Sequence, residues 1–468
     1  MAGRFLSLFK PISRYLPVIS PPKRKVRFTE KIFWTAIVLI LYFIMCEISL
    51  YGVTGGWELS YMRTIFASRR GTLMELGIGP IVTAGLILQL LVGANMIECD
   101  MTDPEDRALF TSASKAFSII FTAIQASAYI IGGVYGALNP IQSIIIFLQL
   151  IAAGIIVILL DELIQKGWGI GSGVSLFILG GVAQQIFNQC FSPVYGGIFP
   201  SIISSLIGGS PPLNDLFVRQ GPSIIGFITT VVAFFVIIYL EGVRVEIPIS
   251  HAMYRGYRGR YPIKLLYVSN LPVIFASALF ANIYFFSQLL SHYFPNNFWA
   301  GLLGTFESKP INPDDPSQGY RNIPTGGLVY YVTSPGWLGG VLQDPLRAFG
   351  YTAILVVFCV IFSITWLEVG GLGPSTVAKQ LVDSGMQIPG YRRSARPIES
   401  LLKRYIPPVA VLGGIIVGLI AAISDFLGVF GSGMGILLSV GIIYQYYQAI
   451  IQERAVDMYP ALRRFFGK

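Results

Sequence analysis

No charged residue interrupts residues 116–160, which read AFSIIFTAIQASAYIIGGVYGALNPIQSIIIFLQLIAAGIIVILL. A helix that spans a bilayer needs about 20 predominantly apolar residues, so this stretch has room for two such helices. The turn-forming residues GALNP at 136–140 divide it at the right place. The apolar residues do not alternate with polar ones, as they would in the strands of a membrane barrel. The stretch therefore predicts two antiparallel membrane helices.

The rest of the chain has the same character. Hydrophobic residues make up 54% of the 468 residues and charged residues 12%, against about 25% charged residues in a soluble domain. Ten apolar segments fit spanning helices, near residues 31–50, 77–95, 113–135, 141–160, 173–190, 222–242, 265–291, 346–367, 405–424 and 432–452. The expected fold is an all-α polytopic membrane protein with ten transmembrane helices.

The charges predict an orientation. With ten spans, both termini and the four loops 96–112, 161–172, 243–264 and 368–404 lie on one side of the membrane. With the helix-flanking Lys31 and Lys115 included, that side carries 26 of the 33 Lys and Arg residues, and the other side carries 7. Because basic residues accumulate on the cytoplasmic side, the segment 1–30 and the tail 453–468 are expected to be cytoplasmic. The segment 1–30 is basic and Pro-containing and could form an amphipathic helix on the membrane surface, so it does not look like a cleavable signal peptide.

Two weak internal repeats divide the chain into halves of five helices. GIGPIVTA at 77–84 resembles SNLPVIFA at 269–276, and GSG recurs at 171–173 and 431–433. Because five is odd, the second half must have inverted topology. We expect halves at 31–190 and 222–452, related by a two-fold axis in the membrane plane and joined by a Gly-, Pro- and Ser-rich hinge at 191–221. Chance recurrence of common membrane residues is the alternative.

The repeats select four aliphatic residues at equivalent positions, one on each of four helices: Val82, Ile178, Ile274 and Leu438. Side chains at symmetric depths would converge on the two-fold axis, where an aliphatic ring makes a dry constriction. Taken singly, each is an ordinary packing or lipid-facing residue.

No catalytic constellation and no metal or cofactor motif is visible in the sequence. The charged residues of the apolar segments lie at helix ends, whereas ion-coupled transporters place charges in mid-membrane. A passive pore therefore fits better than a coupled solute transporter. A membrane scaffold or receptor without transport is the second alternative.

The loops 243–264 and 368–404 are rich in arginine. Gly256 and Gly259 allow a tight hairpin with Arg255 and Arg258 at its tip. Arginines interleaved with tyrosines suit contact with nucleic-acid phosphates and bases. Topology signals and contact with lipid headgroups would require the same charges, and both readings stay open.

Five stretches resemble the SecY family, the large pore-forming (alpha) subunit of the Sec protein translocon, and archaeal members most. They are ASRRGTLMELGIGPIVTAGLILQLL (67–91), KGWGIGSGVSLFI (166–178), RVEIPIS (244–250), GRYPIKLLYVSNLPVIFASALFANI (259–283) and KRYIPP (403–408). The resemblance implies a channel that passes secretory polypeptides across the membrane and releases transmembrane segments sideways into lipid. It implies no enzyme activity, with the driving energy supplied by a partner such as the translating ribosome.

The resemblance also implies residue roles. The pore ring falls on Ile78, Val82, Val174, Ile178, Ile274 and Leu438. A plug sealing the external side of the ring falls at about 57–70, with Trp57, Leu59, Tyr61, Met62, Ile65 and Phe66. Lateral-gate polar residues fall on Thr83, Gln125 and Asn270, and ribosome docking falls on Arg255, Arg258, Arg260, Arg392 and Arg393.

The implied partners are a clamp subunit (SecE, or gamma), a single-span beta subunit, and the ribosome through its RNA. Signal sequences, nascent polypeptides and membrane lipid complete the set. The expected location is the cell membrane in an archaeon or the endoplasmic reticulum membrane in a eukaryote. The external stretch 293–345 is long, and neither the residues nor the resemblance suggests a role for it.

Overall fold

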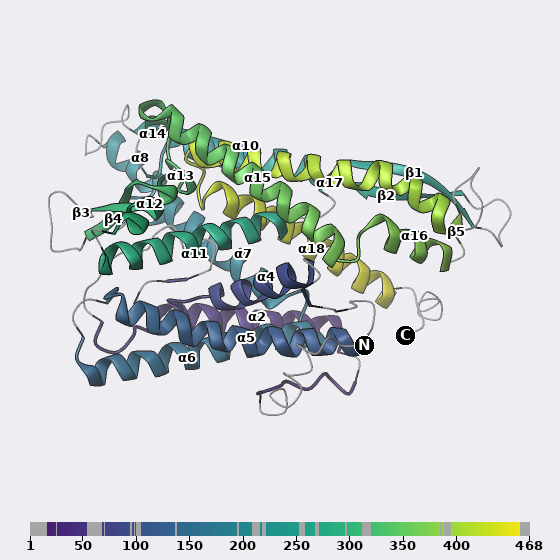
Figure 1. The fold of residues 1–468 in the computed structure, drawn as a ribbon, viewed down its shortest axis with the longest axis horizontal. Helices are drawn as coiled ribbons and strands as arrows, with labels where there is room; N and C mark the ends of the chain where they lie inside the picture. Colours follow the sequence, from purple (N-terminus) through teal and green to yellow (C-terminus); the bar gives the residue numbers. More distant parts are fainter. Residues whose placement is uncertain are drawn as a thin grey trace.

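In a computed structural model, long helices form the body of the protein (Figure 1), ten of them within the residues that the structure describes. The structure describes residues 16–24, 26–53, 68–69, 71–93, 96–97, 99, 104–135, 138–193, 196–207, 216–217, 221–251, 258–266, 271–294, 297–310, 320–383, 386–387 and 395–458. The long helices are α2 (Phe28–Glu47), α4 (Gly79–Gly93), α5 (Pro104–Ile131), α6 (Pro140–Leu163), α7 (Gly173–Phe191), α10 (Ile224–Gly242), α11 (Leu271–Tyr293), α15 (Pro345–Val369), α17 (Ala395–Phe426) and α18 (Gly433–Met458). Each matches one predicted segment.

Nine of these ten helices, within the described ranges, are long and apolar enough to cross a membrane. The exception is α4, which has 15 residues. At 1.5 Å per residue it covers about 22 Å, less than the hydrocarbon thickness of about 30 Å. Large apolar side chains face outward on the long helices, as Leu148 on α6 and Phe235 on α10 do, with 60% and 65% of their surface exposed. Such a surface suits lipid, because soluble monomers rarely expose contiguous apolar patches of this kind. The chain is therefore an integral multi-pass membrane protein with an all-helical membrane region.

Two small sheets lie outside the helical bundle. The first has the order β2-β1-β5, from β1 (Arg244–His251), β2 (Arg258–Lys264) and β5 (Met386–Gln387). The second pairs β3 (Thr305–Pro310) with β4 (Tyr320–Gly326). Short helices complete the fold: α8 (Ile198–Leu206), α12 (Phe298–Leu303), α13 (Leu328–Val332), α14 (Leu338–Gln343), α16 (Pro374–Asp383) and the π-helical turn η2 (Ile164–Trp168). The described residues of the stretch 293–345 thus form short helices and a two-stranded sheet, a small module for which the sequence suggested no role.

Helix α17 begins at Ala395, well before the predicted start at 405, and passes through Pro407 and Pro408. Its early turns bury Ile398, Leu402 and Ile406 completely. These side chains recur every four residues, so they form one apolar face that packs on the hairpin and α16 in a second apolar cluster. Because basic residues lie between these side chains, the sequence before residue 405 resembled a loop rather than a helix.

The two GSG motifs begin α7 and α18, and in both cases the first glycine has positive φ, 76° at Gly171 and 77° at Gly431. A residue with a Cβ atom is strained there. The chain reverses at each motif so that the fifth helix of each half can run back along the fourth.

A buried aspartate from the preceding helix caps each of these two starts. The Asp161 carboxylate at the end of α6 accepts a hydrogen bond from the Val174 amide of α7 (3.0 Å). The Asp425 carboxylate at the end of α17 accepts one from the Gly433 amide of α18 (2.6 Å). The first amides of a helix have no partner within the helix, so these carboxylates satisfy orphan donors. The same device at matching places supports the predicted repeat.

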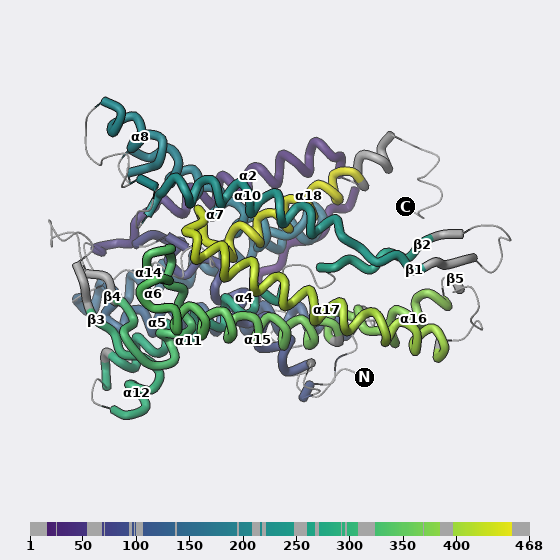
Figure 2. Tube along the Cα trace, turned by 90° about the horizontal axis from the view of Figure 1, so that it is seen from above, coloured from purple at the N-terminus to yellow at the C-terminus, as the bar shows by residue number. Residues whose placement is uncertain are grey.

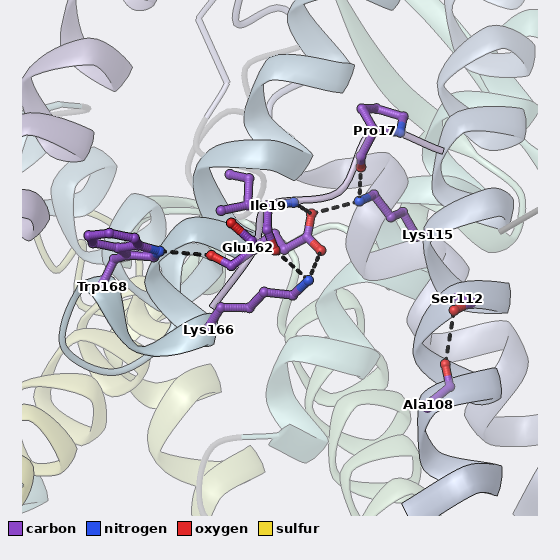
Figure 3. Close-up of polar contacts among 9 residues, drawn as sticks. Pro17, Ile19, Ala108, Ser112, Lys115, Glu162, Lys166 and Trp168 are labelled. Carbon is purple, nitrogen blue, oxygen red and sulfur yellow. Dashed lines mark hydrogen bonds and ion pairs between the residues drawn. The ribbon is translucent and has the colours of Figure 1, made fainter. Parts of the chain in front are cut away.

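Residues 17–20 are strapped across the ends of α5 and α6 (Figure 3). The Glu162 carboxylate pairs with Lys115 of α5 (2.6 Å) and with Lys166 of η2 (2.9 Å). Both ammonium groups also donate to the strap, Lys115 to the Pro17 carbonyl and Lys166 to the Ile19 carbonyl. Because these charges are largely shielded from water, the network ties α5, α6 and the strap into one unit.

Candidate functional site

All six predicted ring residues lie in the main apolar cluster of the bundle. Ile78, Val82, Ile178 and Leu438 are buried members of this cluster, and Val174 and Ile274 are half-buried and pack against it. They come from α4 and the turn before it, α7, α11 and α18. The cluster is far larger than six residues, so their arrangement as a closed ring stays a prediction.

Four helices meet beside this cluster, α4 and α5 from the first half and α11 and α15 from the second. The side-chain amide of Asn282 on α11 donates to the hydroxyl of Thr83 on α4 (3.1 Å) and to the Ala278 carbonyl on its own helix (2.8 Å). We call the Thr83–Asn282 contact the clasp. In apolar surroundings such a bond gives helices a defined register, because each polar group otherwise stays unsatisfied.

A second set of contacts joins α5 to α11 nearer the short helices and strands that follow α11. The rings of Tyr129 and Phe285 stack with their centroids 4.8 Å apart. The Tyr293 hydroxyl donates to the Ile131 carbonyl at the end of α5, where helix carbonyls have no partner within the helix. A Cβ atom added at Gly132 would lie 2.7 Å from a methyl of Leu289. The two helices are therefore packed without a gap at this level.

We call the boundary between α4 and α5 on one side and α11 and α15 on the other the seam. Toward the end of the bundle where the termini lie, a small hollow in the seam is lined among others by Leu86, Leu90, Phe275 and Trp366. The Gln89 amide oxygen is buried beside it and has no hydrogen-bond partner among the described residues.

The structure describes two of the three predicted lateral-gate residues. Thr83 lies in the clasp, and Gln125 is buried on α5. Asn270 lies outside the described residues. The structure gives the polar contact of α11 to Asn282, which sequence reasoning missed. One signal was available: Asn282 follows Ile274 by two helical turns, so it lies on the same face of the helix.

The plug residues Trp57, Leu59, Tyr61, Met62, Ile65 and Phe66 also lie outside the described residues. Their flanks are placed, however. The Leu50 amide donates to the Gly71 carbonyl (2.8 Å), and the Leu73 amide donates to the Ile48 carbonyl (3.0 Å). The flanking residues 48–50 and 71–73 are therefore held side by side at the end of α2.

The two basic loops share one sheet. β1 pairs with β2 from Arg244↔Lys264 to Ser250↔Arg258, which confirms the predicted hairpin. β1 also pairs with β5 of the other loop, at Ser250↔Gln387 and His251↔Met386. Figure 2 shows this sheet and α16 standing out from the end of the bundle where α18 ends. Of the five predicted docking arginines, Arg255, Arg392 and Arg393 lie outside the described residues, and Arg258 is placed in β2.

Arg260 is exposed and already has a partner. Its guanidinium pairs with the Glu246 carboxylate across the hairpin (2.6 Å), and Arg244 approaches the same carboxylate (3.4 Å). The hydrogen bond from Arg260 lowers the pKa of Glu246, and the same contact raises the pKa of Arg260. Both groups are therefore charged at neutral pH.

The fold and the central apolar cluster define a polytopic channel protein, and comparison with known proteins gives its family. The family described as SecY matches residues 72–447, and the plug domain of Sec61p matches residues 40–71. A solved structure of a protein-conducting channel is 40% identical with TM-score 0.83, covering 97% of this chain and 98% of that one. Sec61 in the canine ribosome–channel complex from the endoplasmic reticulum is 40% identical with TM-score 0.80, over the same shares of both chains.

A more distant match is the idle yeast Ssh1 complex bound to the yeast 80S ribosome, at 27% identity and TM-score 0.75, covering 94% of this chain and 93% of that one. The chain belongs to the SecY family. It is the central, channel-forming subunit of a protein translocation channel, as the sequence resemblance predicted.

Proposed function

We propose that the seam between α4 and α5 on one side and α11 and α15 on the other is the lateral gate of this channel. The observation that carries the proposal is the clasp: one hydrogen bond between Thr83 and Asn282 joins the two halves beside the apolar cluster. A transmembrane segment leaving the pore toward lipid would separate these two residues. Ile78, Val82, Val174, Ile178, Ile274 and Leu438 form the ring that the polypeptide crosses, and the segment 57–70 is the plug.

The gate is tested by disulfide crosslinking across the seam. A pair of cysteines at Gly132 and Leu289 should crosslink in the idle channel. A Cβ atom at position 132 would lie 2.7 Å from the Leu289 Cδ1, a methyl that the Leu289→Cys change removes, and a small backbone shift would relieve its 2.7 Å approach to the Ala128 carbonyl. A stalled nascent chain with a signal sequence should abolish the crosslink. A crosslink that forms equally with the signal sequence engaged would place the exit elsewhere.

We further propose that the sheet β2-β1-β5 carries a docking surface for the ribosome, which would supply the driving energy. The support is that both arginine-rich loops join in one sheet, which would present Arg255, Arg258, Arg260, Arg392 and Arg393 to one partner. Two of the similar structures are ribosome-bound channels. A surface that contacts RNA phosphates binds with a strong dependence on salt.

Co-sedimentation with ribosomes in detergent tests this docking without any bilayer. The wild type should sediment with ribosomes at low salt, and the Arg255→Glu, Arg392→Glu double variant should remain in the supernatant. Equal sedimentation of both would mean that these arginines only set topology or contact lipid headgroups.

The sheet then faces the cytoplasm, with both termini on that side, as the distribution of Lys and Arg predicts. The partners within the membrane would be the clamp subunit (SecE, or gamma) and the single-span beta subunit. The exposed apolar side chains of α2 and α10, such as Phe33 and Phe235, provide lipid-facing surface that such helices can cover. The membrane would be the cell membrane in an archaeon and the endoplasmic reticulum membrane in a eukaryote.

A further inference from the structure

The short helix α12 has two different faces. Its inner face packs on α11 and α13, with Ala300 1% exposed. Its outer face carries Phe298, Trp299 and Leu302, whose exposed fractions are 74%, 66% and 55%. The Asn297 side chain caps the helix by accepting from the Trp299 amide (3.2 Å), so the helix is fixed locally and does not depend on a further partner. Three large apolar side chains are left facing away from the protein.

The position of α12 indicates what covers this face. It follows the end of the membrane-spanning helix α11 and stands out sideways from the bundle beside α11 and α15 (Figure 2). Phe286, Tyr293 and Phe294, which lead from α11 to α12, are also exposed, at 49%, 46% and 56%. Among the described residues, exposed apolar side chains therefore occur on the spanning helix, at its end and on α12.

The sequence around α12 fits the same surroundings. No Asp, Glu, Lys or Arg occurs from residue 265 to residue 306, although α12 lies close to the end of the bundle, where charged residues would be expected in water. Trp and Phe are the residues that concentrate at the boundary between hydrocarbon and headgroups, because their rings are apolar while the Trp N–H still reaches polar groups. Short helices with one apolar face lie in the plane of this boundary.

We propose that α12 is an interfacial anchor, which lies in the headgroup–acyl boundary with Phe298, Trp299 and Leu302 inserted among lipids. It is attached to the end of the gate helix α11, so it fixes the depth of α11 in the bilayer while the gate moves. That α12 lies at the membrane boundary follows from the membrane fold alone. That this boundary belongs to the external leaflet depends on the proposed orientation of the chain.

Spin labels measure the depth of this face directly. Labels are introduced as Leu302→Cys on α12 and, as a matched control in the same module, Thr325→Cys, an exposed residue of β4. The background carries Cys99→Ser, because the other three cysteines are buried. The full-length channel is reconstituted into vesicles of phosphatidylcholine and phosphatidylglycerol. Collisions are compared between oxygen, which concentrates in lipid, and a water-soluble nickel chelate.

The Leu302 label should collide more with oxygen, and the Thr325 label more with the nickel chelate. A Leu302 label that collides mainly with the nickel chelate would show that the face is in water and overturn the anchor. A label shielded from both reagents would show that protein covers the face, and would overturn it too. Reduction of the Thr325 label by an impermeant reductant reports the side of the membrane separately, so an inverted orientation refutes the leaflet and leaves the anchor intact.

Discussion

The Asn282 amide on α11 crosses the seam between the two halves to reach the Thr83 hydroxyl on α4, 3.1 Å away. The Asn282 side-chain carbonyl oxygen is buried and finds no hydrogen-bond partner among the residues that the structure describes. The contact therefore stabilises the closed arrangement only partly, which suits a gate that must open and close again. A fully satisfied polar network would hold the helices together more strongly.

Replacing Asn282 by Leu should favour the open gate. An interhelical hydrogen bond in a membrane is worth about 0.6 to 2 kcal/mol, which corresponds to a change of about 3- to 30-fold in the equilibrium. The rate of signal-sequence crosslinking to α4 and α11 would report it. Ser277→Ala is the matched control, because the buried Ser277 hydroxyl bonds only the Ile274 carbonyl within α11. Equal crosslinking in both variants and the wild type would show that the Thr83–Asn282 hydrogen bond does not affect the opening of the gate.

Replacing Tyr293 by Phe should also loosen the closed gate, through the other end of the seam. The ring stays and only the hydroxyl that donates to the Ile131 carbonyl is lost, at a net cost of about 0.5 to 1.5 kcal/mol. The yield of the disulfide between cysteines at Gly132 and Leu289 should fall. Tyr239→Phe on the exposed face of α10 serves as control and should leave the yield unchanged. An unchanged disulfide yield for Tyr293→Phe would show that this hydrogen bond does not help to hold the gate closed.

Polar residues in the ring should make the idle channel leak ions. Aliphatic constrictions gate by excluding water, so Ile78→Asn, Ile178→Asn and Ile274→Asn together should wet the pore. Planar-bilayer conductance measures the leak, and the Ile178→Leu variant should stay tight. Unchanged conductance in the triple variant would refute the assignment of the ring.

Replacing Glu246 by Gln should strengthen docking to ribosomes. The change frees Arg260 and adds one positive charge to the hairpin. If the freed arginine contacts one more phosphate, the slope of log affinity against log salt should steepen by about 0.7 to 0.9. Glu30→Gln, which frees Arg24 at the start of α2, adds the same charge away from the hairpin and should have little effect. Equal gains in both variants would indicate a nonspecific charge effect.

The same pair predicts the pH dependence of docking. Because Arg260 lowers the pKa of Glu246, the pair persists above the ordinary carboxyl range and is lost as pH falls through the lowered value. Wild-type docking should therefore not change between roughly pH 6 and 8 through this carboxylate. A titration of ribosome binding in that range checks it, with Glu246→Gln as the reference.

Removing either helix cap should lower the stability of the channel. Asp425→Ala leaves the buried Gly433 amide and the Tyr351 hydroxyl without their acceptor, at about 1 to 3 kcal/mol for each unsatisfied group. Asp161→Ala should act similarly at the start of α7. Thermal unfolding in detergent measures the loss, and Asp383→Ala on the exposed side of α16 is the control. A melting temperature equal to that of the control would contradict the prediction that these two carboxylates stabilise the channel.

The sequence predicted the helices better than the contacts between them. Length, hydropathy and turn residues located all ten helices, because a bilayer imposes one requirement on each segment separately. The early start of α17 was missed since Lys403 and Arg404 share its first turns with the buried Ile398 and Leu402. The GSG motifs were recognised, but their partners Asp161 and Asp425 were not. Their spacing from the motifs differs between the halves, so no fixed pattern marked them.

The gate residue Asn282 was missed for a related reason. A polar residue in an apolar helix has a role only through what it faces, and the sequence contains no information on the distance between α4 and α11. For Val82, Ile178, Ile274 and Leu438 the repeats supplied equivalent positions on four helices, and the structure places all four in the main apolar cluster. The module between α11 and α15 has no counterpart among the described residues of the first half, and its role remained unexplained at the level of sequence.

The shared sheet has a mechanical consequence. β1 continues from α10 through Val243, β2 leads through residues 265–270 into α11, and β5 lies in the connection between α16 and α17. A load applied at the hairpin is therefore not carried by one helix but is divided among α10, α11 and α17. A partner that docks on the hairpin, as proposed above, would therefore act on three helices of the second half at once.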